Sequence, residues 1–474
     1  MPELPEVETV KETLKDQILG EKIISVDVFY EQIIDESSRI MFKELLLNET
    51  LTDILRYGKY LFFIFENVSL ISHLRMEGKY FIKNINESRN VHEHIIFTFA
   101  SGRTLRYHDT RKFGTMKLVQ TTLFEEIMKE PELSKLGPEA NTDIDIDEFY
   151  NQIKVKKIKL KTALLDQTLI AGLGNIYVDE VCFLSGLHPE YECSKLTKYQ
   201  CMLILENSKY VLEGAIKAGG TTIRSYTSSL GVTGRFQLKL HVHTKEGSLC
   251  ENCSTVIKKI QVGGRGTYFC EICQNKDLPL VVGITGGIST GKSSVSNYIK
   301  SLGYEVIDTD VISRNITNEN NEVITKIKDV FGEEYILDGK LNRTKMGKLV
   351  FNNKEANKKL TDIIHPIVKK EVLNKIKLAS GKIIFVDVPL LYESKFDELC
   401  HQVICVYTTF DVNTKRLMER DNITYEYAIS KINSQMDINL KVQKAHFIID
   451  NSEDLCYTYK QIDKTINKLN EMRK

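Results

Sequence analysis

The stretch Leu280-Val-Val-Gly-Ile-Thr285-Gly286-Gly-Ile-Ser-Thr-Gly291-Lys292-Ser293 decides the fold of the second half of the chain. An apolar run of strand length precedes the pattern G-x4-G-K-S, a phosphate-binding loop that connects a buried strand to a helix. Its glycines let backbone N–H groups surround phosphate oxygens, the lysine reaches the outer phosphates, and the serine binds Mg²⁺. The pattern predicts a parallel α/β domain, and a simple glycine-rich turn is the alternative.

Length and charge limit what the rest of the chain can be. A chain of 474 residues exceeds one hydrophobic core, so we expect two or three domains. The 64 basic residues balance the 64 acidic ones, so any nucleic-acid surface must be local. The best basic patch is Lys154–Lys161, with a solvated face as the alternative. No signal peptide and no apolar run near the ~18 residues of a membrane span are present, which predicts a cytoplasmic protein without membrane contact.

Composition changes along the chain predict its domains. Residues 1–130 combine an early helix with short apolar segments rich in β-branched residues, which indicates a β-sandwich-like domain. Residues 131–225 are expected to be helical, with a break at Gly172-Leu-Gly174. The remaining divisions are a loop and cysteine-rich hairpin at 226–275, a linker at 276–279, and alternating strands and helices at 280–474.

Four cysteines have the spacing of a closed zinc site. Cys250-x2-Cys253 and Cys270-x2-Cys273 lie about 16 residues apart, which predicts one structural Zn²⁺. All four positions are filled, so no position remains for a catalytic water. Four unrelated core cysteines are the alternative. Between the pairs, Gly263-Gly-Arg265-Gly predicts a cationic hairpin tip suited to phosphates or base edges.

The first residues, Met1-Pro-Glu-Leu-Pro-Glu6, carry a second chemical signal. Removal of Met1 makes Pro2 a free secondary amine with Glu3 beside it. An α-amine has a pKa near ~8, against ~10.4 for lysine, so more of it is unprotonated at neutral pH. Such an amine condenses with an aldehyde to an iminium ion, and a neighbouring carboxylate can transfer the protons. An ordinary flexible terminus is the alternative.

Residues 1–275 resemble the formamidopyrimidine-DNA glycosylases, which excise oxidised purines such as 8-oxoguanine from double-stranded DNA. The likeness covers the whole segment and implies an enzyme with glycosylase and abasic-site lyase activities and a helix-two-turn-helix domain. It rests on Met1–Glu8, Arg56-Tyr-Gly-Lys59, His73-Leu-Arg-Met76, Asp109-Thr-Arg111-Lys-Phe113, Gly172-Leu-Gly-Asn175, and the cysteine hairpin with Arg265.

The resemblance implies a role for each matching residue. Pro2 is the nucleophile at the sugar C1′, Glu3 is the acid and base, and Lys59 binds the phosphate near the lesion. Arg265 is counted with these catalytic residues and, like Asn175, holds the bent DNA backbone. The wedge that fills the gap left by the flipped base consists of Met76, Arg111 and Phe113.

The sequence departs from that family at several places. Lys112 stands where arginine is usual, and His243-Thr244-Lys245 replaces Tyr-Gly-Arg before the zinc hairpin. The lesion-recognition loop near Ser225–Gln237 matches loosely. These changes concern lesion preference more than the type of reaction.

Residues 279–474 resemble the dephospho-CoA kinases, which phosphorylate the ribose 3′-hydroxyl of dephospho-CoA with Mg-ATP. The motifs follow the family order: Val306-Ile-Asp308-Thr-Asp310, Leu341-Asn-Arg343, Ile364-His365-Pro366, Asp387-Val-Pro-Leu-Leu-Tyr-Glu393 and Arg416-Leu-Met-Glu-Arg420. The resemblance implies that ATP is bound by Gly286, Gly287, Ile288, Ser289, Thr290, Gly291, Lys292, Ser293 and Arg420, with Ser293 on Mg²⁺.

On the acceptor side, the resemblance makes Asp310 the base for the ribose hydroxyl, with Asp308 as the alternative, and makes Lys292 catalytic. Arg420, on the expected lid, neutralises the transferring phosphoryl group, with Arg416 as the second candidate for this role. Asp387 orders Mg²⁺ or the acceptor. His365 and Arg343 belong to the acceptor region, with a buried structural histidine as the alternative. Departures are Ser289-Thr290, Lys431 and His446.

The leading interpretation is therefore a bifunctional chain, a fusion of two enzymes. The alternatives are a lesion-binding module without turnover in the first half, and another P-loop nucleotide kinase or a regulatory ATPase in the second. Pro2 together with Glu3 favours an enzyme, and the acceptor motifs favour a kinase. The predicted partners are lesion-containing DNA, ATP and dephospho-CoA, and no protein partner follows from the sequence.

Overall fold

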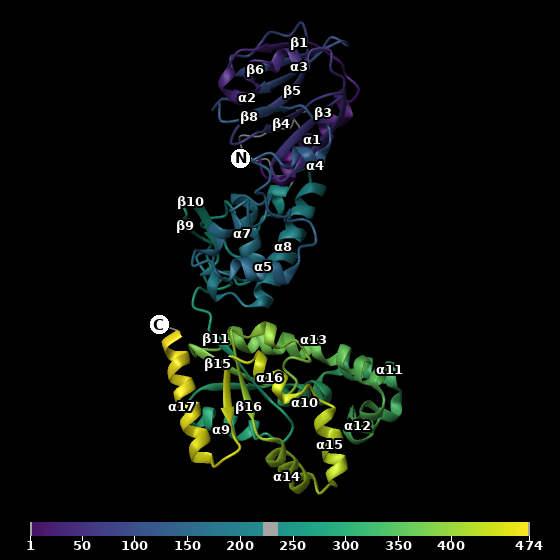
Figure 1. The fold of residues 1–474 in the computed structure, drawn as a ribbon, viewed down its shortest axis with the longest axis vertical. Helices are drawn as coiled ribbons and strands as arrows, with labels where there is room; N and C mark the ends of the chain where they lie inside the picture. Colours follow the sequence, from purple (N-terminus) through teal and green to yellow (C-terminus); the bar gives the residue numbers. More distant parts are fainter. Residues whose placement is uncertain (1, 221–235, 473–474) are drawn as a thin grey trace. The chain divides into compact units, whose positions relative to one another are not determined.

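The computed structural model describes residues 2–220 and 236–472. The chain divides into two compact units, Met1–Lys276 and Asp277–Lys474, and each is described by itself (Figure 1). Within the described residues, no helix is long and apolar enough to cross a membrane.

The first unit begins with a β-sandwich. Two antiparallel sheets have the strand orders β1-β6-β7-β5 and β2-β3-β4-β8, which confirms the predicted β-sandwich-like fold. Helix α1 (Leu4–Ile18) buries Val7, Val10, Leu14 and Ile18 in a core shared with both sheets. The other elements are β1 (Ile23–Val28), α2 (Glu36–Arg39), α3 (Phe42–Leu46), β2 (Leu51–Tyr57), β3 (Tyr60–Phe65), β4 (Ser69–His73), β5 (Lys79–Asn84), β6 (Glu93–Phe99), β7 (Arg103–His108) and β8 (Thr115–Val119).

A helical part follows within the same unit. It consists of α4 (Phe124–Ile127), α5 (Ile146–Ile153), α6 (Leu160–Leu164), α7 (Asn175–Leu184) and α8 (Lys198–Lys217). The loop before α7 packs on the start of α1, because the backbone N–H of Leu4 donates to the carbonyl of Gly172 over 3.1 Å. A Cβ on Gly172, where φ is +101°, would lie 2.5 Å from the Leu4 side chain, so this contact needs glycine.

The zinc hairpin completes the first unit. Strands β9 (Lys258–Val262) and β10 (Arg265–Phe269) pair antiparallel. Gly263 and Gly264 both have positive φ, as a tight two-residue hairpin turn requires. Arg265 is therefore the first residue after the turn, and its side chain is exposed.

The second unit is built on a five-stranded parallel sheet with the order β12-β15-β11-β16-β17, as the phosphate-loop pattern predicts. The strands are β11 (Leu280–Gly286), β12 (Glu305–Asp308), β15 (Ile383–Asp387), β16 (Gln402–Tyr407) and β17 (Phe447–Asp450), and β13 (Ile336–Leu337) and β14 (Lys340–Leu341) form a separate hairpin.

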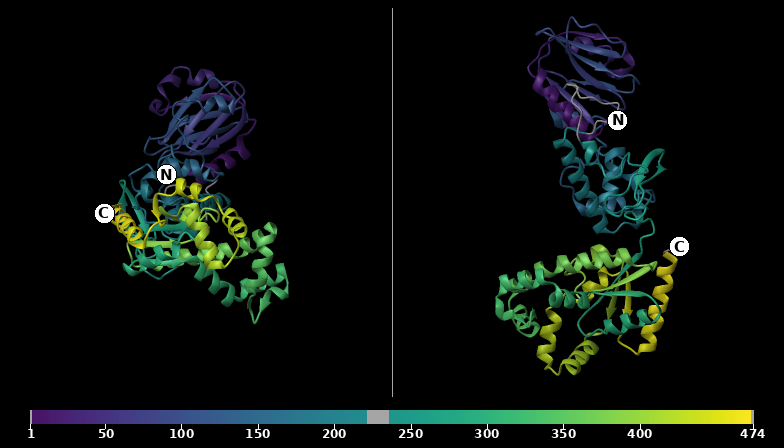
Figure 2. Two further views of the ribbon diagram at one scale, coloured as in Figure 1. Left: turned by 60° about the horizontal axis from the view of Figure 1, so that its bottom comes forward. Right: turned by 180° about the vertical axis from the view of Figure 1, so that it is seen from behind.

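Helices surround this sheet. Helices α9 (Lys292–Ser301) and α17 (Leu455–Met472) pack on it and on each other through a shared apolar core. Figure 2 shows the green helices α10 to α13 as a group that extends away from the strands. The remaining bounds are α10 (Thr309–Glu319), α11 (Asn321–Phe331), α12 (Arg343–Asn352), α13 (Lys354–Leu378), α14 (Phe410–Asp421), α15 (Tyr425–Asn433) and α16 (Ile438–Lys444).

Candidate functional site

Pro2 and Glu3 lie together at the start of α1, and both are buried. The Glu3 carboxylate faces the first turn of α7, where the backbone N–H of Ile176 donates to Oε1 over 2.9 Å. A Cβ on Gly174 would lie 2.3 Å from the Glu3 carboxyl carbon. The glycine therefore allows the helical part to approach the N-terminus closely enough to hold this carboxylate.

Lys59 comes from the turn between β2 and β3 and reaches the same loop. Its side chain is buried, and Nζ donates to the carbonyl of Leu173 over 2.6 Å. Burial lowers the pKa of Lys59 to about 8, although the acidic groups nearby oppose the shift. Burial also raises the pKa of Glu3 despite the attraction of Lys59. Burial thus makes Glu3 easier to protonate and Lys59 easier to deprotonate, which suits both groups to proton transfer.

Glu6 belongs to this cluster, although no sequence motif predicted a role for it. Tyr177 Oη donates to Glu6 Oε1 over 2.6 Å, and the backbone N–H of Glu3 donates to Glu6 Oε2 over 3.0 Å. The Glu3-x-x-Glu6 spacing at a helix start is the available signal, because residues three apart face each other across the first turn.

The predicted wedge residues come from two loops of the sandwich. Met76 is half-buried in the loop between β4 and β5, while Arg111 and Phe113 are exposed between β7 and β8. The Arg111 guanidinium lies 4.9 Å from the centre of the Phe113 ring. Lys112, at φ +57°, places its ammonium 4.5 Å from the ring of Tyr30.

A buried carboxylate shapes the second of these loops. Asp109 is fully buried and accepts hydrogen bonds from the backbone N–H groups of Arg111, Phe113 and Gly114, each over 2.9 Å. Because these three donors lie within four residues of the loop, one side chain fixes the backbone that presents Arg111 and Phe113.

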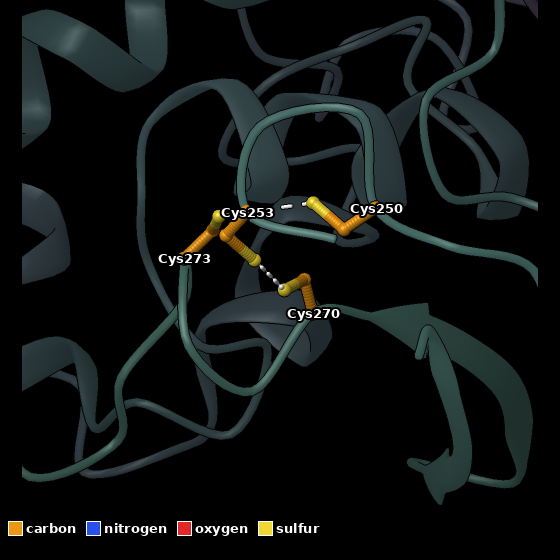
Figure 3. A group of neighbouring side chains, drawn as sticks. All are labelled: Cys250, Cys253, Cys270 and Cys273. Atoms are coloured by element: carbon orange, nitrogen blue, oxygen red, sulfur yellow. Dashed lines mark hydrogen bonds between the residues drawn. The ribbon is translucent and has the colours of Figure 1, made fainter. Parts of the chain in front are cut away.

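The four predicted zinc ligands converge on one point (Figure 3). The sulfur atoms of Cys250, Cys253, Cys270 and Cys273 all lie within 4.8 Å of one another. Zn–S bonds of about 2.3 Å in a tetrahedron place sulfurs about 3.8 Å apart, so the donor set fits one Zn²⁺. Cys253 and Cys270 are 3.3 Å apart, and Cys250 and Cys273 are 3.8 Å apart.

Helix α7 anchors this hairpin through two buried acids. Asp179 accepts from Lys161 Nζ over 2.7 Å and contacts His243 Nδ1 over 2.7 Å. Glu180 accepts from the backbone N–H groups of Val242 and His243 over 2.9 and 2.8 Å. His243, a departure from the family pattern, is thus part of the support beneath the hairpin.

The prediction of a basic surface patch at Lys154–Lys161 is wrong in part. Lys161 is fully buried in the ion pair with Asp179. Lys156 and Lys159 pair with Asp166 and Glu190 over 3.7 and 2.5 Å. Periodicity could not reveal this, because the acids that neutralise the lysines come from other segments of the fold.

Asn175 and Arg265 are linked through the hairpin backbone. Asn175 Nδ2 donates to the carbonyl of Gly266 over 3.1 Å, and Lys161 Nζ reaches the same oxygen over 3.2 Å. This carbonyl follows Arg265 directly, so α6 and α7 together fix the tip that carries the exposed guanidinium. The part of the predicted lesion loop before residue 236 lies outside the described residues.

In the second unit, the phosphate loop lines a cavity of about 460 Å³. A second cavity of about 240 Å³ adjoins it, and Asp310 and Pro389 line both. The first is lined by Gly286, Gly287, Ile288, Ser289, Thr290, Gly291, Lys292, Ser293, Asp310, Pro389, Arg416, Arg420 and Gln435. Asp310 therefore lies on the wall that the two cavities share.

The carboxylates around the loop differ in their contacts. Lys292 pairs with Asp387, which is buried and also accepts from Ser296 Oγ over 2.6 Å. Asp308 caps α10 by accepting from the backbone N–H groups of Asp310 and Val311. Partial burial raises the pKa of Asp310, against the attraction of Lys292. The geometry thus favours Asp310 over Asp308 for contact with a substrate.

The cations of α14 occupy different places. Arg416 donates to the carbonyl of Asn451 over 2.8 Å, while Arg420 pairs with Asp421 over 2.8 Å. Lys431, a departure from the family pattern, pairs with the same Asp421 over 2.9 Å. Arg420 is exposed and borders the first cavity.

Of the two residues predicted for the acceptor region, His365 and Arg343, only His365 lines one of the two cavities. His365 is half-buried and lines the second cavity, and burial lowers its pKa. Arg343 lines neither cavity; it donates to Thr317 Oγ1 over 2.7 Å and ties α12 to α10. His446 Nδ1 accepts from the backbone N–H of Val403 over 3.1 Å, between β16 and β17.

Together these features define the class of protein. The first unit has the architecture of a DNA glycosylase, and the second has that of a P-loop phosphotransferase. Family models agree. The formamidopyrimidine-DNA glycosylase N-terminal domain matches residues 1–116, its H2TH domain matches 136–227, and the zinc finger found in FPG and IleRS matches 247–276. Dephospho-CoA kinase matches 280–456.

The chain belongs to the formamidopyrimidine-DNA glycosylase family and carries a dephospho-CoA kinase domain as its second unit. The formamidopyrimidine-DNA glycosylase of Ligilactobacillus salivarius is 47% identical over 277 residues, which is 58% of this chain and 99% of that protein. The Mycoplasma mobile enzyme is 46% identical over 275 residues, again 58% of this chain and 99% of its own length.

Solved structures give the same assignment. Lactococcus lactis Fpg in complex with DNA containing an abasic site is 42% identical, with a TM-score of 0.55, and the match covers 58% of this chain and all of that one. The wild-type Lactococcus lactis protein with DNA containing N7-benzyl-Fapy-dG gives the same values.

Proposed function

We propose that the first unit excises oxidised purines from double-stranded DNA and cleaves the resulting abasic site, and that the second phosphorylates dephospho-CoA. The burial of Pro2 and of Glu3, whose carboxylate accepts from the first turn of α7 and feels the charge of Lys59, carries the first part. The cavity lined by the phosphate loop, with Asp310 on the wall it shares with a second cavity, carries the second.

In the first reaction, the Pro2 amine attacks the sugar C1′ and the base leaves with the electron pair of the glycosidic bond. Opening of the sugar ring gives an iminium ion, which accepts electrons during β-elimination of the 3′-phosphate. Glu3, with its raised pKa, supplies and removes the protons. Lys59 and Arg265 supply positive charge to DNA phosphates, and Asn175 supports the backbone contact.

The wedge completes the DNA-binding part of the proposal. An enzyme that acts at C1′ must turn the nucleotide out of the helix, and side chains inserted into the stack compensate for the lost stacking. Phe113 and Arg111 are exposed on a loop held by Asp109, and Met76 lies on the neighbouring loop. A Zn²⁺ ion bound by the four cysteines would support this interface by holding the hairpin that carries Arg265.

Borohydride trapping tests this reaction, because reduction converts the iminium ion into a stable amine. The full chain should be trapped on duplex DNA with 8-oxoguanine opposite cytosine. A Pro2→Gly variant, and protein that keeps Met1, should not be trapped. Equal trapping of these proteins would point to a lysine, with Lys59 first. DNA binding without trapping or cleavage would favour a lesion-binding module.

In the second reaction, Asp310 removes the proton of the ribose 3′-hydroxyl, which attacks the γ-phosphate of ATP. Lys292 and Arg420 stabilise the charge on the transferring group. Ser293 and Asp387 offer oxygen ligands suited to Mg²⁺, which would neutralise the phosphates when bound. Because Lys292 now pairs with Asp387, nucleotide phosphates would compete for this lysine.

Phosphate transfer from radiolabelled ATP to dephospho-CoA tests the kinase. Lys292→Ala should reduce the rate by orders of magnitude, and Asp310→Asn should reduce kcat more than it weakens ATP binding. The trapping reaction should not change in either variant. ATP hydrolysis without transfer would favour a regulatory ATPase.

Cysteine thiolates that bind zinc require a reducing environment, which supports the proposal of a cytoplasmic location.

A further inference from the structure

The buried Lys441 side chain contacts the backbone of two residues, Gly286 and Pro389, that line the cavities of the second unit. It projects from α16, and its side chain is fully inaccessible to solvent. An ammonium group has three N–H donors and is rarely buried unless all of them are paired. The acceptors of Lys441 therefore show what this residue connects.

Three oxygen atoms surround the ammonium group. Lys441 Nζ lies 2.9 Å from Glu393 Oε1, 3.2 Å from the carbonyl of Pro389 and 3.4 Å from the carbonyl of Gly286. Gly286 is the last residue of β11 and the first of the phosphate loop. Pro389 follows β15 and lines both cavities. The Lys441 ammonium group thus connects the start of the phosphate loop at Gly286 to Pro389 on the wall that the two cavities share.

Neighbouring contacts strengthen this connection. The side-chain oxygen of Gln435 accepts from the backbone N–H of Ile288 over 3.0 Å. Glu393 Oε1 also accepts from the backbone N–H of Met436 over 3.1 Å. The segment leading into α16 therefore contacts both the phosphate loop and the chain that follows the shared wall.

We propose that Lys441 is a positioning residue for phosphoryl transfer, which holds the phosphate loop and the Pro389 wall at the separation that aligns donor and acceptor. The inference rests on the proposed kinase function. Lys441 lines neither cavity, so it acts through the backbone it binds. Small errors in the alignment of two reactants reduce the rate strongly while each reactant still binds.

Steady-state kinetics of Lys441→Met on the full chain test this proposal. The methionine keeps most of the length but has no donor. We expect kcat to fall at least tenfold, while KM for ATP and for dephospho-CoA stays within threefold. Lys444→Met is the matched control, because Lys444 is exposed on the same helix and should leave kcat within twofold. Glycosylase activity of the first unit verifies the concentration of active chain.

Each outcome decides between the proposals. A wild-type chain that does not phosphorylate dephospho-CoA overturns the proposed kinase function and this inference with it. An active wild type with an unchanged kcat in Lys441→Met overturns the inference alone, as does a fall in kcat that merely follows the loss of folded protein by circular dichroism. If Lys441→Met does not fold, Lys441→Gln decides: its shorter, uncharged amide cannot reach all three oxygen atoms, and an unchanged kcat in the folded variant overturns the inference.

Discussion

The loop that carries Arg111 and Phe113 depends on Asp109, and Asp109→Asn tests that dependence. The carboxylate accepts three backbone N–H groups, each over 2.9 Å, inside the protein. The amide has nearly the same shape but replaces one oxygen with a donor. At least one loop N–H then loses its acceptor, at a cost of about 1–3 kcal/mol, and the bonds that remain lose their charge assistance.

A total of about 2 kcal/mol or more is thus removed from the ordered form of the loop, which corresponds to roughly 30-fold in its population. If the loop is needed to displace the base, single-turnover excision of 8-oxoguanine opposite cytosine should slow by about that factor. Cleavage of a preformed abasic site should change by less than about threefold, since no base must be displaced.

Asp27→Asn, an exposed position on β1, is the control for charge and should leave both rates unchanged. Two results would refute the reasoning. An Asp109→Asn variant with normal excision would show that the loop is ordered without the carboxylate. An equal loss on both substrates would show general damage to the active site rather than a misplaced wedge.

The zinc-binding cysteines and the buried Lys59 give two further predictions. Cys270→Ser removes one of four thiolates, so the chain should lose zinc by metal analysis and bind lesion DNA more weakly, while Cys456→Ser, at an exposed position, should do neither. Lys59 has a folded pKa of about 8, below its unfolded value, so the unfolded state binds more protons between about pH 8 and 10.5 and stability rises with pH there. Lys59→Met lacks the resulting penalty of about 3 kcal/mol at neutral pH. In urea unfolding, the free energy of unfolding of the variant minus that of the wild type should therefore decline from pH 7 to pH 9.5. A difference that stays constant with pH would contradict the interpretation that Lys59 is a buried lysine with a lowered pKa.

Short-range patterns in the sequence predicted the architecture correctly. The strand before Gly286 and the helix after Lys292 follow from one local motif, and the sheet that contains them is parallel as expected. The two Cys-x2-Cys pairs also converge as their spacing predicts. Such features depend on a few neighbouring residues, whose turn and hairpin geometry is nearly independent of the rest of the chain. The roles assigned to individual site residues stay predictions until the variants are measured.

The supporting contacts could not be predicted in the same way. The basic stretch before residue 161 suggested an exposed patch, yet Lys161 is buried because Asp179 of another helix neutralises it. Asp109 and Lys441 also gained no role from their positions in the sequence, although Asp109 binds three loop N–H groups and Lys441 binds the carbonyls of Gly286 and Pro389.

The sequence by itself therefore determined the domains' fold classes, the zinc ligand set and the nucleotide-binding loop, because each rests on local periodicity or spacing. Tertiary structure alone decided which charges are buried, which acids lie near Lys59, which acids pair with Lys161 and Lys441, and where Glu3 and Asp310 lie relative to other elements. The physical reason is that burial and pKa depend on groups far apart in the chain, and only packing of the whole unit brings those groups within a few ångströms.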